Sequence, residues 1–301
     1  VNQYGADIVR LWATSVAYQQ DVRISDEIMK QIAEGYRKIR NTMRFVLGNL
    51  NDFKESDLVD IKDLPGVDQY MLAKLNQLMK AYDEAYNNYD FASANQEILN
   101  YFTNTLSSFY MDFTKDILYI EKADALRRRQ VQTVLYHHAK TMMKLLSTVL
   151  VFTSEELHDN FTCDENKAES VFLEPKYQLF DIPQEEEVLA YFDKFLDVRK
   201  DVLRALEGLR NDQVIKSNME AKVTLTLKEG YQDVAQLADD LKQLFIVAKV
   251  QLSDNKELPE YDTSYIQVEK FHGHQCPRCW NYFDEDEMEG ELCHRCHDVV
   301  E

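Results

Sequence analysis

Residues Ser25 to Phe53 read SDEIMKQIAEGYRKIRNTMRFVLGNLNDF, and this stretch decides how the first part of the chain folds. Its apolar residues recur at helical spacing and form one stripe along a helix of about seven turns. Ser25 stands at the position of an N-cap, and the two acids that follow it suit the positive end of the helix dipole. The stripe consists of Ile32, Tyr36, Ile39, Met43, Val46 and Leu50. The pattern predicts a long helix that packs one face on a core.

A basic stripe lies beside the apolar one on the same predicted helix. Arg37, Arg40 and Arg44 recur at helical spacing with Lys38 and Asn41 nearby, and no acid occurs between positions 35 and 51. One interpretation is a bundle helix whose arginines pair with carboxylates on neighbouring elements. The other is a face that grips the phosphates of a nucleic acid, which requires cations spaced along its backbone.

Composition sets wider bounds. The chain has 301 residues, of which 45% are hydrophobic, and this allows two or three domains with real cores. Only 8 Gly and 5 Pro favour long helices over a turn-rich all-β fold. No run of eighteen or more apolar residues and no N-terminal signal pattern occurs. We therefore expect a cytoplasmic protein without a membrane partner.

The net charge of −19 opposes a polyanionic partner when it is averaged over the whole chain. The charge is unevenly distributed, however. Residues 125–154 contain no acid and include Arg127, Arg128 and Arg129, whereas acids cluster at 185–187 and 284–291. This segregation fits a basic groove on an acidic body, although surplus acids also keep a protein in solution.

Further helical patterns precede and follow the opening stretch. A short helix is predicted near 4–12, with Asp7 placed to pair with Arg10. Thr153 to Glu156 form a capping-box pattern, which predicts that another helix begins there. Residues 161–183 read as a crossing linker. Longer helices are predicted near 68–86, 91–109, 124–149 and 188–209.

After the last long helix, the sequence pattern changes from helical periodicity to alternating strands and a shorter helix. Residues 223–227 alternate with period two, as a half-buried strand does, and further strands are predicted near 246–252 and 264–268 with a helix near 234–245. We therefore predict a mainly α protein, in which a helical bundle is followed by a small α+β domain.

Four of the five cysteines form two C-x2-C pairs separated by thirteen residues. Two such pairs, here called knuckles, can bring four thiolates to the corners of one tetrahedron, which is the geometry that zinc accepts. Four sulfurs leave no open position, so we expect one structural zinc and no catalytic role for it. The alternative is two disulfides, one within each pair. The predicted ligands are Cys276, Cys279, Cys293 and Cys296.

Several short motifs, taken in order, resemble bacterial isoleucyl-tRNA synthetases of class I. KIRNT at 38–42 is similar to the first helix of their anticodon-binding bundle, and YGAD at 4–7 resembles a stretch that follows their KMSKS signature. CPRCW at 276–280 and CHRC at 293–296 resemble their C-terminal zinc finger. Formamidopyrimidine-type DNA glycosylases close with a similar finger, but they begin with proline and glutamate, whereas this chain begins Val1-Asn2.

The resemblance implies a division into a connector at 1–24, an anticodon-binding helical bundle at 25–165, a linker with the α+β domain at 166–270, and a zinc-finger module at 271–301. It also implies recognition of the tRNA for isoleucine by a ligase that attaches isoleucine to tRNA using ATP. HIGH and KMSKS are absent from this sequence. We therefore expect an excised, monomeric fragment that has no catalytic residues and is inactive alone, with ATP bound only by the missing catalytic domain of the same polypeptide.

The residues that the resemblance places against tRNA lie on the basic stripe and in the finger. They are Arg37, Lys38, Arg40, Asn41, Arg44, Arg278, Trp280 and Arg295. Trp280 has two open interpretations: it fills the core of the finger, or it stacks on an unpaired base. The alternative function is a zinc-containing helical scaffold for protein interactions, in which the basic stripe pairs with internal acids. Salt-dependent tRNA binding separates these two functions, since a protein scaffold predicts none.

Overall fold

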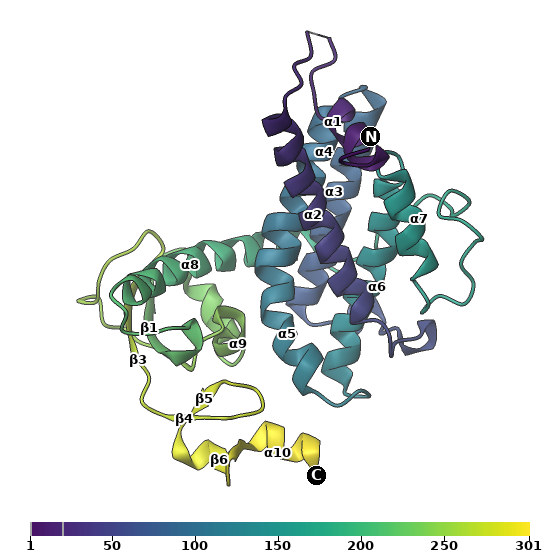
Figure 1. Ribbon diagram of the computed structural model, residues 1–301. Coiled ribbons are helices and arrows are strands. Elements are labelled where there is room, and N and C mark those ends of the chain that lie inside the picture. The colour runs from purple at the N-terminus through teal and green to yellow at the C-terminus, as the bar shows by residue number, and fades with distance from the viewer. Residues whose placement is uncertain (1, 20) are drawn as a thin grey trace. The chain divides into compact units, whose positions relative to one another are not determined.

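The computed structural model describes residues 2–19 and 21–301 (Figure 1). The chain forms two compact units. One comprises the residues up to Thr114 together with Ala123–Glu185, and the other comprises Lys115–Lys122 and Glu186–Glu301. The predicted fold class is confirmed: the chain is mainly α, with a helical bundle, then a small α+β region and a C-terminal four-cysteine module. The division at 24, 165 and 270 stays a prediction.

The first unit is a bundle of helices. Its elements are α1 (Ala6–Thr14), α2 (Asp26–Gly48), α3 (Gly66–Asn87), α4 (Phe91–Asn100), a π-helix (Tyr101–Tyr110), the first residues of α5 (Met111–Ile120), α6 (Leu126–Leu146) and α7 (Val151–Asp159), with 3-10 turns at Glu55–Asp57 and Ile61–Asp63. The segment predicted as one helix near 91–109 is therefore a longer helical run with a π segment inside it. The buried aromatic side chains of that segment pack into the bundle core.

Helix α2 confirms the apolar stripe. Ile39, Met43, Val46 and Leu50 are each at most 2% exposed. The Ser25 hydroxyl accepts a hydrogen bond from the Ile28 amide and caps the helix, as predicted. The helix ends at Gly48, earlier than the stretch suggests.

A buried ion pair joins three helices of the bundle. Asp68 of α3 is fully buried, and it accepts hydrogen bonds from the Tyr110 hydroxyl and from two nitrogens of Arg127 on α6. A buried carboxylate is tolerated only where such partners compensate its lost hydration.

The predicted capping box at Thr153 is wrong. Helix α7 begins at Val151, and no side chain of its N-cap residue bonds to it. Instead, the Asp7 carboxylate of α1 accepts hydrogen bonds from the amide and hydroxyl of Thr153, at 2.7 and 2.6 Å. A carboxylate from another helix thus satisfies the free amides and removes the need for a local box.

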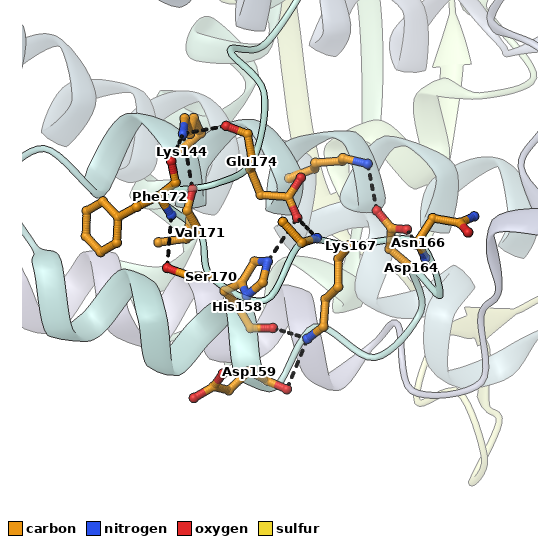
Figure 2. A network of polar contacts seen from close by, with 12 residues as sticks. Lys144, His158, Asp159, Asp164, Asn166, Lys167, Ser170, Val171, Phe172 and Glu174 are labelled. Carbon is orange, nitrogen blue, oxygen red and sulfur yellow. Dashed lines mark hydrogen bonds and ion pairs between the residues drawn. The ribbon is translucent and has the colours of Figure 1, made fainter.

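The predicted linker at 161–183 is held to the bundle by a polar network (Figure 2). The Lys144 ammonium donates to the carbonyl oxygens of Val171, Phe172 and Glu174. The Glu174 carboxylate in turn bonds the buried His158 ring at 3.0 Å. These bonds order a segment that has no helix or strand of its own.

The second unit contains a long helix and a three-stranded sheet. Its main elements are α8 (Glu185–Asn211), β1 (Ala221–Leu227), α9 (Leu241–Phe245), β2 (Lys249–Leu252) and β3 (Ser264–Lys270), with 3-10 turns at Asn218–Glu220 and Gln232–Leu237. The strand order is β2-β1-β3, with β1 parallel to β2 and antiparallel to β3. The helix predicted near 234–245 is broken into a 3-10 turn and α9, and the two aspartates before α9 are poor helix formers.

The C-terminal module is built from two small hairpins and a short helix. Its elements are β4 (His274–Gln275), β5 (Tyr282–Phe283), a 3-10 turn (Glu285–Glu287), β6 (Met288–Glu289), β7 (Leu292–Cys293) and α10 (His294–Val300). Strand β4 pairs with β5, and β6 pairs with β7, both antiparallel. In the part of the chain that the structure describes, no helix has the length and apolarity needed to cross a membrane.

Candidate metal centre and nucleic-acid interface

The two hairpins bring the four predicted cysteines together. Their sulfur atoms all lie within 4.8 Å of one another, and Cys276, Cys293 and Cys296 are buried. The four are free thiols and not disulfides. The sulfurs of Cys279 and Cys293 are 3.8 Å apart. Zinc–sulfur bonds of about 2.3 Å place the sulfurs of a tetrahedral site about 3.8 Å apart, so the cluster fits a metal ion of this size.

Backbone amides favour the thiolate form, which is the form that binds metal, at Cys276, whereas burial raises the pKa of the Cys279 and Cys293 thiols. Burial opposes the charge of Cys276, but hydrogen bonds from the amides of Cys279, Cys293 and Arg278 outweigh it and lower the pKa of this thiol to about 6. Cys276 is thus the thiol of the cluster that loses its proton most readily, and the others need the field of a metal ion to ionise.

Trp280 does not fill the core of the finger. Its side chain is 64% exposed, and the residues packed around the cysteines are others, including Phe283, Met288 and Leu292. Its backbone has φ 64°, in the left-handed region, while its amide bonds the Cys276 carbonyl at 2.8 Å. This conformation costs a large side chain about 1 kcal/mol. The fold thus holds an exposed indole at a strained position beside the cysteine cluster.

The two finger arginines predicted to contact tRNA are engaged within the protein. Arg295 makes two bonds to the Asp116 carboxylate, at 2.5 and 2.8 Å, and lies 3.7 Å from Glu121. Arg278 donates to the Ile120 carbonyl at 2.8 Å. Both arginines therefore anchor the finger to the end of α5, inside the second unit.

Two arginines of the basic stripe also have partners. Arg40 makes a two-bonded ion pair with Glu156 of α7, at 2.7 and 2.6 Å, and Arg37 pairs with Glu34 at 2.7 Å. The Glu156 carboxylate raises the pKa of Arg40, and Arg40 lowers that of Glu156. The interpretation of internal pairing thus holds for part of the stripe.

The rest of the stripe is open. Lys38, Asn41 and Arg44 are exposed, and among the described residues their side chains have no hydrogen-bond or ion-pair partner. Arg37, Asn41 and Arg44 fall on one face of α2, because residues three and four apart lie above one another on a helix. The structure therefore leaves an exposed row along α2 that carries two arginines.

The three arginines at 127–129, at the start of α6, are less exposed than the open part of the basic stripe on α2. Arg127 bonds the buried Asp68, Arg128 lies 3.0 Å from Asp52, and Arg129 donates to the Asp52 backbone carbonyl at 3.0 Å. These side chains are mostly covered, and each is paired within the bundle.

Comparison with known proteins identifies the class. Residues 68–225 match the family described as the anticodon-binding domain of tRNA ligase. Because this match covers more than half of the chain, the chain belongs to that family. The predicted resemblance is confirmed at this level.

The particular tRNA ligases that it resembles are isoleucine–tRNA ligases. That of Staphylococcus epidermidis is 44% identical over 307 residues, which cover 100% of this chain and 33% of the relative. Those of Geobacillus thermodenitrificans and Bacillus mycoides are 42% and 44% identical, again over 100% of this chain and 34% and 33% of their own lengths. The chain thus spans about a third of these curated relatives, and it corresponds to their C-terminal third.

Proposed function

We propose that this chain binds the anticodon stem-loop of the tRNA for isoleucine. Membership of the anticodon-binding family supports tRNA recognition, and the similarity to isoleucine–tRNA ligases supports the choice of tRNA. The observation that carries the proposal is the exposed row on α2. Arg37, Asn41 and Arg44 share one face of a packed helix, and a guanidinium group matches a phosphate through two parallel hydrogen bonds.

The finger supplies a different kind of contact. The Trp280 indole is exposed and held by a strained backbone, and base stacking on an aromatic ring is worth about 1–3 kcal/mol per base. Unpaired loop bases are the part of an RNA that such a ring reaches. We infer that Trp280 stacks on an unpaired base. Arg278 and Arg295 are assigned to holding the finger in place, and direct contact of either with tRNA stays a prediction.

A zinc ion held by Cys276, Cys279, Cys293 and Cys296 completes the proposal. The sulfur positions and the lowered pKa of Cys276 support this ligand set. All four positions of a tetrahedral ion would be filled by protein, so the ion would stabilise the module without taking part in a reaction.

The activity of a whole ligase is also a proposal. As part of a longer polypeptide, this chain would present tRNA to a catalytic domain that joins isoleucine to it with ATP. Asp7 and the helix that carries it would then connect that domain to the bundle. A monomeric state and a cytoplasmic location stay predictions.

A tRNA titration tests the proposal against the protein-scaffold alternative. The zinc-loaded chain is titrated with a transcript of the tRNA for isoleucine at several salt concentrations. We expect saturable binding whose affinity falls steeply with salt, because phosphate contacts release condensed counterions. A zinc-loaded, folded chain that shows no salt-dependent binding would favour the scaffold.

A further inference from the structure

Glu156 of α7 lies against the proposed RNA-binding face. Both of its carboxylate oxygens accept hydrogen bonds from Arg40, and Arg44 of the same stripe also acts on it electrostatically. It thus neutralises one arginine of the stripe and attracts another. The sequence from 36 to 50 contains no acid, so the carboxylate that faces Arg40 comes from another helix.

The position of Glu156 is well defined because the start of α7 is fixed. The Thr153 hydroxyl bonds the Tyr36 hydroxyl of α2 at 3.0 Å and also donates to Asp7 of α1. The Tyr36 hydroxyl in turn lies 3.4 Å from an Arg40 nitrogen. A continuous polar network therefore sets α7 against α2 one turn before Glu156.

The ion pair itself is open to solvent. The side chains of Arg40 and Glu156 are 32% and 53% exposed. The Nη1 and Nη2 groups that bind the Glu156 carboxylate form a fork that also binds a phosphate, so a phosphate that approaches this edge of the Arg40 guanidinium has to displace Glu156. An exposed pair of this type is weak, and a phosphate can displace it.

We propose that Glu156 competes with an RNA phosphate for Arg40 and thereby lowers the affinity of this chain for tRNA. The inference rests on the proposed function, because it takes the α2 face as the surface that meets the RNA. An RNA phosphate must break the Arg40–Glu156 pair before it can bind the edge of Arg40 that Glu156 occupies. Glu156 would thus weaken the phosphate contacts, which do not depend on RNA sequence. Base contacts such as that of Trp280 would then contribute a larger share of the free energy of tRNA binding.

The size of the effect follows from the weakness of the pair. An exposed ion pair is favoured over its open form by at most about fivefold, and apparent affinity scales with the fraction of the competent form. Glu156→Gln should therefore tighten tRNA binding by about 2-fold to 6-fold. Asp159→Asn is the matched control: it removes one charge from the same helix, and its carboxylate has no arginine partner among the described residues. It should change affinity less than about 2-fold.

A double-mutant cycle in zinc-loaded protein tests the competition directly. The chain and its Glu156→Gln, Arg40→Gln and double variants are titrated with the transcript of the tRNA for isoleucine at one salt concentration. We expect Arg40→Gln to weaken binding, and Glu156→Gln to tighten it only while Arg40 is present. Weaker or unchanged binding by a folded Glu156→Gln variant would overturn the competition and leave the proposed function standing, provided that Arg40→Gln weakens binding. Unchanged binding by Arg40→Gln would overturn both the inference and the assigned contact.

Discussion

Asp116 of α5 and Arg295 of α10 form an ion pair with two hydrogen bonds, at 2.5 and 2.8 Å. The same carboxylate accepts bonds from the side chains of Asn281, at 3.1 Å, and Gln243, at 3.4 Å. One acid thus joins the residue after Trp280, the second knuckle of the finger, and α9. Within the second unit, this carboxylate sets where the finger presents its exposed indole.

Asp116→Ala should therefore loosen the finger. Removing the carboxylate leaves the partly buried Arg295 without its main partner, which costs about 1–3 kcal/mol. We expect a lower free energy of unfolding of the second unit and weaker tRNA binding, while the zinc content is unchanged. Asp298→Asn removes an exposed acid from the same module and should change neither. An Asp116→Ala protein with the stability and affinity of the parent would show that other contacts hold the finger.

Removal of zinc should unfold the finger and spare the bundle. A module of about thirty residues gains on the order of 10 kcal/mol from a structural zinc, which its small core cannot replace. We expect one zinc per chain by elemental analysis, and loss of that zinc in Cys279→Ser. Cys163→Ser, which alters a buried cysteine outside the cluster, should keep the metal. Metal-free protein from a preparation without chelator would contradict the predicted site.

Asp7→Ala tests the cap that one helix provides for another. The carboxylate is 7% exposed and bonds the amide and hydroxyl of Thr153. We expect a loss of about 1–2 kcal/mol in unfolding free energy, which is the range for a lost N-cap. Asp26→Ala, in the exposed first turn of α2, should cost less than about 0.5 kcal/mol. Equal losses of unfolding free energy in the two variants would mean that the hydrogen bonds from Thr153 to Asp7 add nothing beyond the effect of a negative charge near a helix N-terminus.

The stability of the bundle should depend on pH through two histidines of α6. Burial lowers the pKa of both His137 and His138 to about 4, from 6.5. Between these values the unfolded chain binds more protons than the folded one, so stability rises with pH across this window and falls as pH drops toward 4. The slope is up to about 1.4 kcal/mol per pH unit for each histidine.

Urea unfolding at pH 5, 6 and 7 measures this dependence. His137→Asn should reduce the slope of unfolding free energy against pH, because up to about one proton fewer is bound on unfolding. The contribution of His138 should remain. The His138 ring is bonded on both sides, to the Tyr101 hydroxyl and to the Val134 carbonyl, each at 2.7 Å. A slope that is the same in parent and variant would show that His137 is solvated in the folded state.

Much of the fold could be predicted because the deciding interactions are local. The Ser25 cap spans three residues, and the buried stripe of α2 is visible in the spacing of its apolar residues. The four cysteines likewise sit in two pairs, each within three residues, and their chemistry leaves few ligands to choose between.

The interactions that could not be predicted join residues far apart in the chain. Asp7 and Thr153 are 146 residues apart, Arg40 and Glu156 are 116 apart, and Asp116 and Arg295 are 179 apart. No pattern in one sequence indicates which acid meets which base at such separations. For this reason the sequence left open whether the arginines of the basic stripe are paired, and it identified neither Glu156 as the partner of Arg40 nor Asp116 as the partner of Arg295.

The most direct test of the account is the salt dependence of tRNA binding when the α2 stripe is neutralised. Arg37, Arg40 and Arg44 are changed together to glutamine in zinc-loaded protein, and the parent and variant are titrated with the tRNA for isoleucine. A variant with Arg127, Arg128 and Arg129 neutralised serves as the comparison, once its folding is verified. We predict that the stripe variant binds more weakly and that its salt slope is flatter by up to about three units, roughly one per lost phosphate contact. A folded stripe variant that binds zinc and keeps the parent affinity and slope would contradict the assignment of this face to tRNA.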